Sequence, residues 1–270
     1  MNNNESSVLR LEYSPWTVEI KVTVIMARIS QDFIAKLAKT INSFNVPCVL
    51  WGHCLLNVHG VPSIIGSIDF IVSDEQLQLS IGAISTQARR LVSCHNPDTC
   101  PFGSKDRFTP PPAFHMHVRD DLNITVGLYP QSDTLWFLPP LAKALPDATA
   151  KFHGNTLFAM ASDSTVLPPS RPGRGSGVFT DKGCHHVVVP QAAVLLEAYM
   201  RLYARDAEKK IGSFAMAMID YVEQYIDEDG LLDVNLLPAP LGWFYLQLKS
   251  GEMPVRQWTK ELREALGVRS

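Results

Sequence analysis

The sequence predicts an α+β protein in which a mixed sheet is flanked by helices and followed by a helical C-terminal region. Three observations support this fold class. Strand-like and helix-like segments alternate between residues 30 and 92, a hairpin pattern occupies 114–129, and apolar residues recur at helical spacing after Pro190. With 270 residues, 46% of them hydrophobic, the chain is also long enough to bury a sizeable core.

Shifts in composition divide the chain into four predicted regions. They are an N-terminal extension over 1–26, an α/β core over 27–165, a Pro/Gly-rich loop over 166–189 and a helical region over 190–270. Alternating β-forming residues between 9 and 28 are typical of an edge strand. The stretch 167–183 holds three prolines, four glycines and two arginines, which favours a mobile loop or a domain junction.

The individual elements follow from caps and apolar runs. Ser30 is the expected N-cap of a helix that ends near Pro47. The expected elements after it are a strand over 48–51, a short helix over 54–58, a strand over 64–72, a helix from 75 to about 92, hairpin strands over 114–119 and 122–129, a short strand over 135–138, and helices over 190–203, 208–225, 241–249 and 254–266.

Charge and hydropathy argue against several classes of partner. The formal net charge is −3 and no polybasic surface is evident, so we expect no nucleic-acid partner. No run approaches the roughly 20 apolar residues of a membrane span, and the first seven residues do not read as a secretory signal. We therefore expect no membrane association and a cytoplasmic protein, and the oligomeric state stays open.

The cysteines fit a reduced compartment, because they are five in number and have no paired spacing. They are Cys48, Cys54, Cys94, Cys100 and Cys184. Cys94, His95 and Cys100, with Asp98 between them, are conceivable zinc ligands, but they match no closed four-ligand spacing. Unpaired thiols are the favoured interpretation, and we expect no metal and no cofactor.

The most informative stretch runs from Val49 to Val72. It reads Val-Leu-Trp-Gly-His-Cys over 49–54 and Gly-Ser-Ile-Asp-Phe-Ile-Val over 66–72, with Gly60 between. This pattern resembles the nucleotidyltransferase superfamily, in its minimal or antitoxin-type fungal branch. The resemblance implies a nucleotidyltransferase-like mixed sheet, with a strand, a glycine that opens a short helix, and a second strand that bears an Asp-x-Asp pair.

The chemistry of that family explains the pattern. A glycine lets the backbone approach a triphosphate, and helix amides favour its charge. Two carboxylates at positions i and i+2 of a strand share one face, where they hold Mg²⁺ ions, and a third carboxylate on a neighbouring strand completes the site.

This sequence departs from the family pattern at each of these points. His53 stands where a second glycine is expected, and Ser67 stands where the first carboxylate is expected, so only Asp69 remains. The strand over 122–129 contributes no acid, although a register shift of two residues would bring Asp74 or Asp121 nearer. We therefore predict that the catalytic carboxylates are largely lost, because one acid does not readily hold two Mg²⁺ ions against their hydration.

Histidines provide replacement chemistry in the same cleft. His115 and His117 lie at i and i+2 of a strand and share a face, and we predict an acid–base cluster of these two with Asp69 and His53. Partly exposed histidines bonded to backbone and a His-His-Asp metal site remain alternatives. The predicted substrate-binding residues are Trp51, Gly52, Ser67, Thr125 and Trp136.

These residues favour a repurposed small-molecule enzyme. The overall sequence resembles norbornene-forming [4+2] cyclases (Diels–Alderases) of sordarin-type terpenoid biosynthesis, which implies a cyclase or isomerase acting on an apolar fungal natural-product intermediate. Such catalysis needs mainly shape and a well-placed hydrogen bond. The alternatives are an active Mg-dependent nucleotidyltransferase and a catalytically dead binding module.

Overall fold

A seven-stranded mixed sheet forms the centre of the computed structural model, which describes residues 29–96, 99–104, 107–145, 155–181, 183 and 185–268. The sheet has the order β3-β4-β5-β2-β1-β7-β6. Its strands are β1 (Cys48–Trp51), β2 (Ser67–Val72), β3 (Leu91–Ser93), β4 (Phe114–Val118), β5 (Asp121–Pro130), β6 (Phe158–Met160) and β7 (Val188–Pro190). The edge strand expected between residues 9 and 28 lies outside the described residues.

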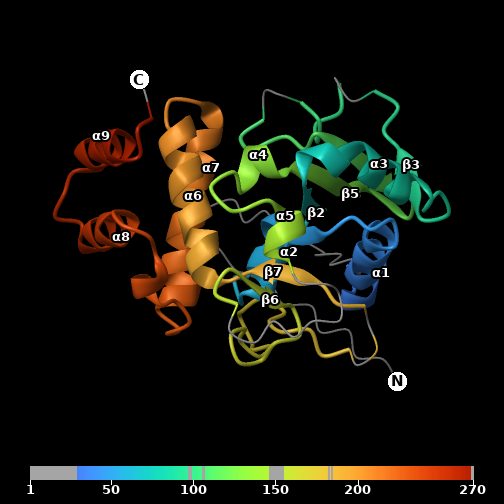
Figure 1. Cartoon of the computed structure of the whole chain (residues 1–270), viewed down its shortest axis with the longest axis horizontal. Coiled ribbons are helices and arrows are strands. Elements are labelled where there is room, and N and C mark those ends of the chain that lie inside the picture. Colours follow the sequence, from blue (N-terminus) through green and yellow to red (C-terminus); the bar gives the residue numbers. More distant parts are fainter. Residues whose placement is uncertain are drawn as a thin grey trace, which may run out of the picture.

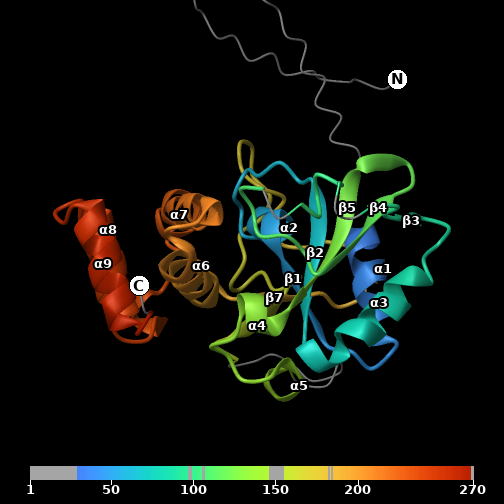
Figure 2. The same ribbon diagram turned by 90° about the horizontal axis from the view of Figure 1, so that it is seen from above.

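Helices cover both faces of this sheet, which confirms the α+β class. They are α1 (Gln31–Asn42), α2 (Gly52–Val58), α3 (Leu77–Ser85), α4 (Gln131–Thr134), α5 (Leu141–Ala144), α6 (Ala192–Asp206), α7 (Lys210–Val222), α8 (Leu241–Ser250) and α9 (Val255–Ala265), with a π-helical turn at Glu223–Asp227. Helices α1 and α3 lie on one side, α6 and α7 on the other, and α8 and α9 form an outer layer beyond them (Figures 1 and 2). Among the described helices, none combines the length and apolar character needed to cross a bilayer.

The register of the central strands determines which side chains share a face. Trp51 pairs with Asp69 across β1 and β2, Asp69 with Gly127 across β2 and β5, and Gly127 with His115 across β5 and β4. Directly paired residues point to the same face of a sheet. One row across the sheet therefore carries Trp51, Asp69, Gly127 and His115 on the face covered by α6, where the Trp51 ring lies 5.5 Å from that of Tyr199.

Two expected elements are wrong in the structure. The helix expected to run to Val92 ends at Ser85, and the Leu91–Ser93 segment pairs with β4 as β3. The strand expected over 135–138 is instead a turn, because the buried amide of Gln131 donates to the carbonyl oxygens of Leu135, Leu138 and Pro139 at 3.3, 3.3 and 2.9 Å. Gln131 thus satisfies backbone carbonyl groups that would otherwise need hydrogen bonds from a neighbouring strand.

The Pro/Gly-rich loop is bonded to α2. The backbone N–H of Ser176 donates to the side-chain oxygen of Asn57 at 2.8 Å, and the N–H of Gly177 donates to the Asn57 carbonyl oxygen at 3.1 Å. The two loop arginines, Arg171 and Arg174, both pair with the carboxylate of Asp229. In the structure these arginines therefore neutralise an acid of the C-terminal region.

The outer helical layer is attached through a buried tryptophan. Trp258 of α9 is fully buried, and its indole N–H donates to the carbonyl oxygen of Phe244 in α8 at 2.7 Å. Its ring also lies 5.7 Å from that of Tyr203 in α6. One side chain thus joins α8, α9 and α6.

Replacing Trp258 by alanine tests whether this layer belongs to the same folding unit. We expect Trp258→Ala to lower the free energy of unfolding by about 3–5 kcal/mol, because it removes a buried aromatic ring and its hydrogen bond. Urea unfolding followed by circular dichroism measures the change. Trp243→Ala is the matched control, since Trp243 is half exposed, and we expect a loss below about 1 kcal/mol. Equal losses in the two variants, or a separate transition for the outer layer, would contradict one cooperative unit.

Candidate functional site

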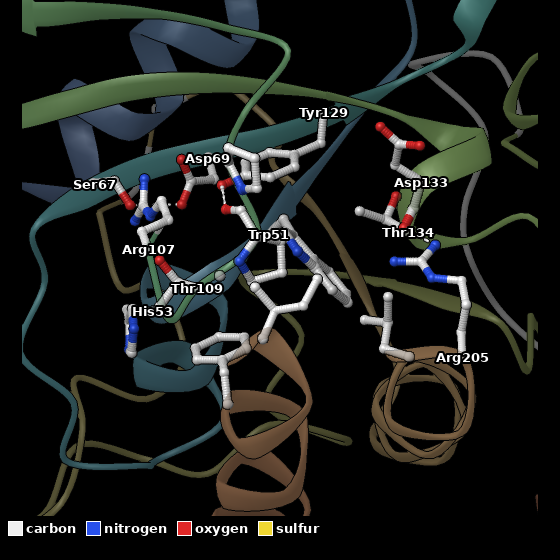
Figure 3. A pocket seen from close by; sticks show the side chains of 16 residues that line it. Trp51, His53, Ser67, Asp69, Arg107, Thr109, Tyr129, Asp133, Thr134 and Arg205 are labelled. Carbon is white, nitrogen blue, oxygen red and sulfur yellow. Dashed lines mark hydrogen bonds between the residues drawn. The ribbon is translucent and has the colours of Figure 1, made fainter. Parts of the chain in front are cut away.

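A pocket of ≈ 160 Å³ opens at the ends of β1 and β2, against α6 and α7 (Figure 3). Its walls combine apolar rings and aliphatic side chains with acids and two arginines. The lining residues are Trp51, Gly52, His53, Ser67, Asp69, Arg107, Thr109, Pro110, Pro111, Tyr129, Asp133, Thr134, Leu202, Arg205, Ile211 and Phe214. This volume lies below the roughly 300–1,000 Å³ of pockets that enclose a drug-sized ligand, so the pocket suits a small molecule or one end of a larger one.

Asp69 lies between two glycines at the inner end of the pocket. A β-carbon on Gly52 would approach the Oδ2 atom of Asp69 to 2.7 Å, and one on Gly127 would approach its Oδ1 atom to 2.4 Å. Gly52 also has a φ of 65°, in the left-handed region that favours glycine. The two glycines therefore provide the space that the carboxylate occupies.

Burial dominates the acidity of Asp69, whose side chain accepts a hydrogen bond from the Ser67 hydroxyl at 2.6 Å. Desolvation of this buried residue raises its pKa to about 6, although the Ser67 hydrogen bond and the positive charge of Arg107 act in the opposite direction. Near neutral pH, Asp69 can therefore exchange a proton with a bound molecule.

His53 and Arg107 lie on the same side of the pocket as Asp69 (Figure 3). The Nδ1 atom of His53 lies 2.5 Å from the hydroxyl oxygen of Ser63, and its ring stacks edge-on against Phe214. Burial, followed by the charge of Arg107, lowers the pKa of His53, so its neutral form is favoured. Arg107 is held by a hydrogen bond from its guanidinium to the carbonyl oxygen of Phe102.

The opposite side of the pocket is also polar. Figure 3 shows Asp133, Thr134 and Arg205 there, supplied by α4 and α6. Arg205 donates to the carboxylate of Asp206 at 2.7 and 2.9 Å and to the backbone oxygen of Asp133 at 2.9 Å. Its guanidinium is thus largely engaged by protein groups, which leaves Arg107 as the arginine nearer the Asp69 end.

The structure brings together five of the predicted site residues. Trp51, Gly52, His53, Ser67 and Asp69 all line the pocket. Three further predicted residues lie on β4 and β5 and do not line it: these are His115, His117 and Thr125. The functional roles assigned to all of these residues remain predictions.

The expected cluster of Asp69 with both histidines is therefore divided. The strand beside β2 is β5, and β4 with His115 and His117 lies one strand further away. The rings of His115 and His117 are 5.3 Å apart, which confirms that they share a face, but they face Cys94 and Cys100. Trp136 is 38% exposed and packs against Arg205, outside the pocket lining.

Sequence reasoning missed the polar residues that come from loops and from α6. Arg107 stands in the Pro- and Cys-rich loop and Arg205 in a helix, far in sequence from the glycine motif. Arg205 follows Leu202 by one helical turn on α6, so both side chains lie on the same face of that helix. This spacing is the one sequence signal that links Arg205 to the pocket.

The donor set does not fit a pair of Mg²⁺ ions of the kind that the fold resemblance implies. Asp69 has Ser67 two residues before it and Gly127 as its partner on β5, so neither neighbour supplies a carboxylate. The register alternatives are excluded as well, since Asp74 binds Ser132 and Asp121 accepts from the backbone of Asn123 at the far end of β5. Asp133, the other acid in the lining, lies on the opposite side of the pocket (Figure 3).

Comparison with known proteins gives weak similarities. No model of a known protein family matches the sequence, and no curated protein matches it. The crystal structure of an antigenic nucleotidyltransferase-like protein from Paracoccidioides brasiliensis is similar at a TM-score of 0.43 and 10% identity, covering 86% of this chain and 91% of that one. The solution structure of the antibiotic-resistance factor ANT(2'')-Ia is similar at a TM-score of 0.34 and 14% identity, covering 80% and 95%. Neither similarity assigns a chemistry to this chain.

The raised pKa of Asp69 predicts a pH-dependent stability. Because the folded state holds this proton up to about pH 6 and the unfolded chain releases it near pH 4, the free energy of unfolding falls as pH rises between these values. Urea unfolding from pH 4 to 7 measures it. Relative to Asp69→Asn, which does not titrate, we expect the wild type to lose about 2 kcal/mol between pH 4 and pH 7.

Ser67→Ala provides the matched variant. It removes the hydrogen bond that lowers the pKa of Asp69, so the fall in stability extends to higher pH. Parallel curves for the wild type and Asp69→Asn would show that this carboxyl group has an ordinary pKa.

Proposed function

We propose that this chain is a small-molecule enzyme built on a nucleotidyltransferase-like fold that has lost most of its metal-binding carboxylates. In this proposal it promotes a cyclisation or isomerisation, of the [4+2] cycloaddition type, of a largely apolar fungal natural-product intermediate. One observation carries the proposal: among the described residues, buried Asp69 has no second carboxylate at the neighbouring strand positions, which are occupied by Ser67 and Gly127. The succession of β1, Gly52, α2 and β2 supports the fold assignment.

The pocket combines an apolar wall with a polar end, and such a reaction needs both. Trp51, Leu202 and Phe214 offer apolar surface against which the reacting end of a polyene can be held in a folded conformation. Asp69 and Arg107 supply hydrogen-bond donors at one end, where a carbonyl group of the substrate would lie. Holding the two reacting parts together removes much of the entropic barrier of a cycloaddition.

A hydrogen bond to the carbonyl oxygen accelerates the reaction further. As the diene adds to the activated double bond, electron density moves toward the carbonyl oxygen, so a bond from Arg107 or from protonated Asp69 strengthens in the transition state. Two of the three reacting π-bonds are converted into two carbon–carbon σ-bonds. The third π-bond moves to the two central carbon atoms of the former diene. All atoms and electrons stay in the substrate, and no co-reactant is needed.

Arg107 is the residue whose loss tests this role most directly. With a synthetic linear triene that carries an α,β-unsaturated aldehyde, we expect a product of unchanged mass and altered chromatographic retention. Arg107→Met should lower kcat/KM by about 10²–10³, because it removes a donor that acts in the transition state. Arg171→Met is the matched control, since Arg171 pairs with Asp229 outside the pocket, and should leave kcat/KM within about threefold. Unchanged turnover in Arg107→Met would contradict the proposal.

Nucleotide transfer is the rival function, and the two pocket arginines are the observation that favours it, because they suit an anionic ligand. We expect titration calorimetry with each Mg-nucleoside triphosphate to give no saturable heat, because the carboxylates for the metal are missing. Saturable binding that disappears in Asp69→Asn would instead establish a nucleotidyltransferase. Absence of both nucleotide binding and triene turnover would identify a binding module.

A further inference from the structure

A second polar cluster lies on the same face of the sheet, toward its β3 edge. It consists of Cys94, Cys100, His115 and His117, each of which offers one ligand atom, and these atoms all lie within 4.8 Å of one another. The pocket lining includes none of the four. Because soft sulfur and imidazole donors converge here, the cluster has the composition of a zinc site.

The pairing of β3 with β4 creates the cluster. Val92 pairs with His117 and Ser93 with Met116, so Cys94, two residues after Val92, falls on the face that carries both histidines. His115 and His117 lie at i and i+2 of β4 and point to that face. Cys100 reaches it from the loop after β3, which completes four donors from two distant segments.

The ligand groups are already oriented. The Nδ1 atom of His117 lies 2.7 Å from the carbonyl oxygen of Leu122 and so carries the proton, which leaves the Nε2 lone pair directed at the Cys100 sulfur, 3.5 Å away. Hydrogen bonds of this kind orient ligands and increase their affinity for a metal.

His115 supplies the independent observation. It is 5% exposed, and its buried Nε2 atom has no hydrogen-bond partner among the residues that the structure describes. Buried polar atoms are nearly always paired, so an orphaned imidazole nitrogen beside two thiols and a second imidazole indicates a missing ligand.

We propose that these four residues bind one Zn²⁺ ion in a closed, tetrahedral, structural site. Zinc–sulfur bonds of about 2.3 Å and zinc–nitrogen bonds of about 2.0–2.1 Å place sulfur and nitrogen about 3.5 Å apart in a tetrahedron, as Cys100 and His117 already are. A contraction of about 1 Å brings the remaining atoms within range. The four donors fill the coordination sphere, so the ion holds structure and leaves no position for a substrate.

The ion would fix the loop that carries Arg107. Phe102 stacks edge-on against His117, with ring centroids 5.7 Å apart, and its carbonyl oxygen accepts the hydrogen bond from Arg107. The loop thus joins the zinc ligand Cys100 to the pocket arginine through a short, directly bonded path. The zinc site itself stands independently of the proposed reaction.

Metal analysis of the full-length protein tests the proposal. We expect about one equivalent of zinc per chain when the protein is purified under reducing conditions without chelator. After removal of zinc, Co²⁺ should produce the thiolate charge-transfer and tetrahedral ligand-field absorption bands of a site with two sulfur ligands. Binding should release protons, because both thiols become thiolates.

Variants locate the site. Cys94→Ser, Cys100→Ser and His117→Gln should each weaken zinc binding by more than about 100-fold, which exceeds the loss expected when only a group that orients a ligand is removed. Cys48→Ala is the matched control, because Cys48 is a buried thiol outside the cluster, and it should retain full stoichiometry. If the wild type binds neither zinc nor Co²⁺ at micromolar concentration, or if the cluster variants bind as well as Cys48→Ala, the proposal is wrong. The Co²⁺ spectrum of the wild type decides the question even where a variant fails to fold.

Discussion

The accommodation of one carboxyl group between two glycines is the constraint on which the pocket depends. Gly52 and Gly127 leave the volume that Asp69 fills, and the register of β1, β2 and β5 places all three residues together. Asp69 is buried there, so its pKa is determined by desolvation more than by a charged partner. A carboxyl group held in this way can exchange a proton with a bound molecule near neutral pH.

The two arginines of the pocket differ in how far protein contacts occupy them. Arg107 approaches from a loop and influences Asp69 and His53 through its field, while Arg205 is engaged by Asp206. The guanidinium of Arg205 is therefore occupied by protein groups, whereas Arg107 can contact a bound molecule. The polar end of the pocket is consequently small, and aromatic and aliphatic side chains make up much of the remaining wall.

The local signals of the sequence predicted the central elements well. Ser30 caps α1 as expected, with its hydroxyl oxygen accepting from the Phe33 N–H at 3.1 Å, and the strand–glycine–helix–strand succession over 48–72 is confirmed. The strands β3, β6 and β7 have three residues each, too few for a periodic pattern, so only their pairing partners define them.

The candidate site was less predictable than the fold, because several of its residues come together only through tertiary contacts. Residues adjacent in sequence, such as Trp51 and Gly52, line the pocket together, as their positions in one motif suggest. Arg107 enters the pocket from a loop, and the neighbourhood of Cys94 with His117 depends on the pairing of β3 with β4, which local periodicity did not predict. A search confined to contiguous ligand spacings therefore favoured unpaired thiols.

Helix α6 contacts both the pocket and the outer helical layer. One face presents Leu202 and Arg205 to the pocket, and Tyr203 on the same helix contacts Trp258 of the outer layer. The width of the pocket is therefore set in part by residues that never touch its contents. Substitutions in α8 or α9 that shift α6 by a fraction of an ångström would change which molecules fit the pocket, even where the sheet residues stay identical.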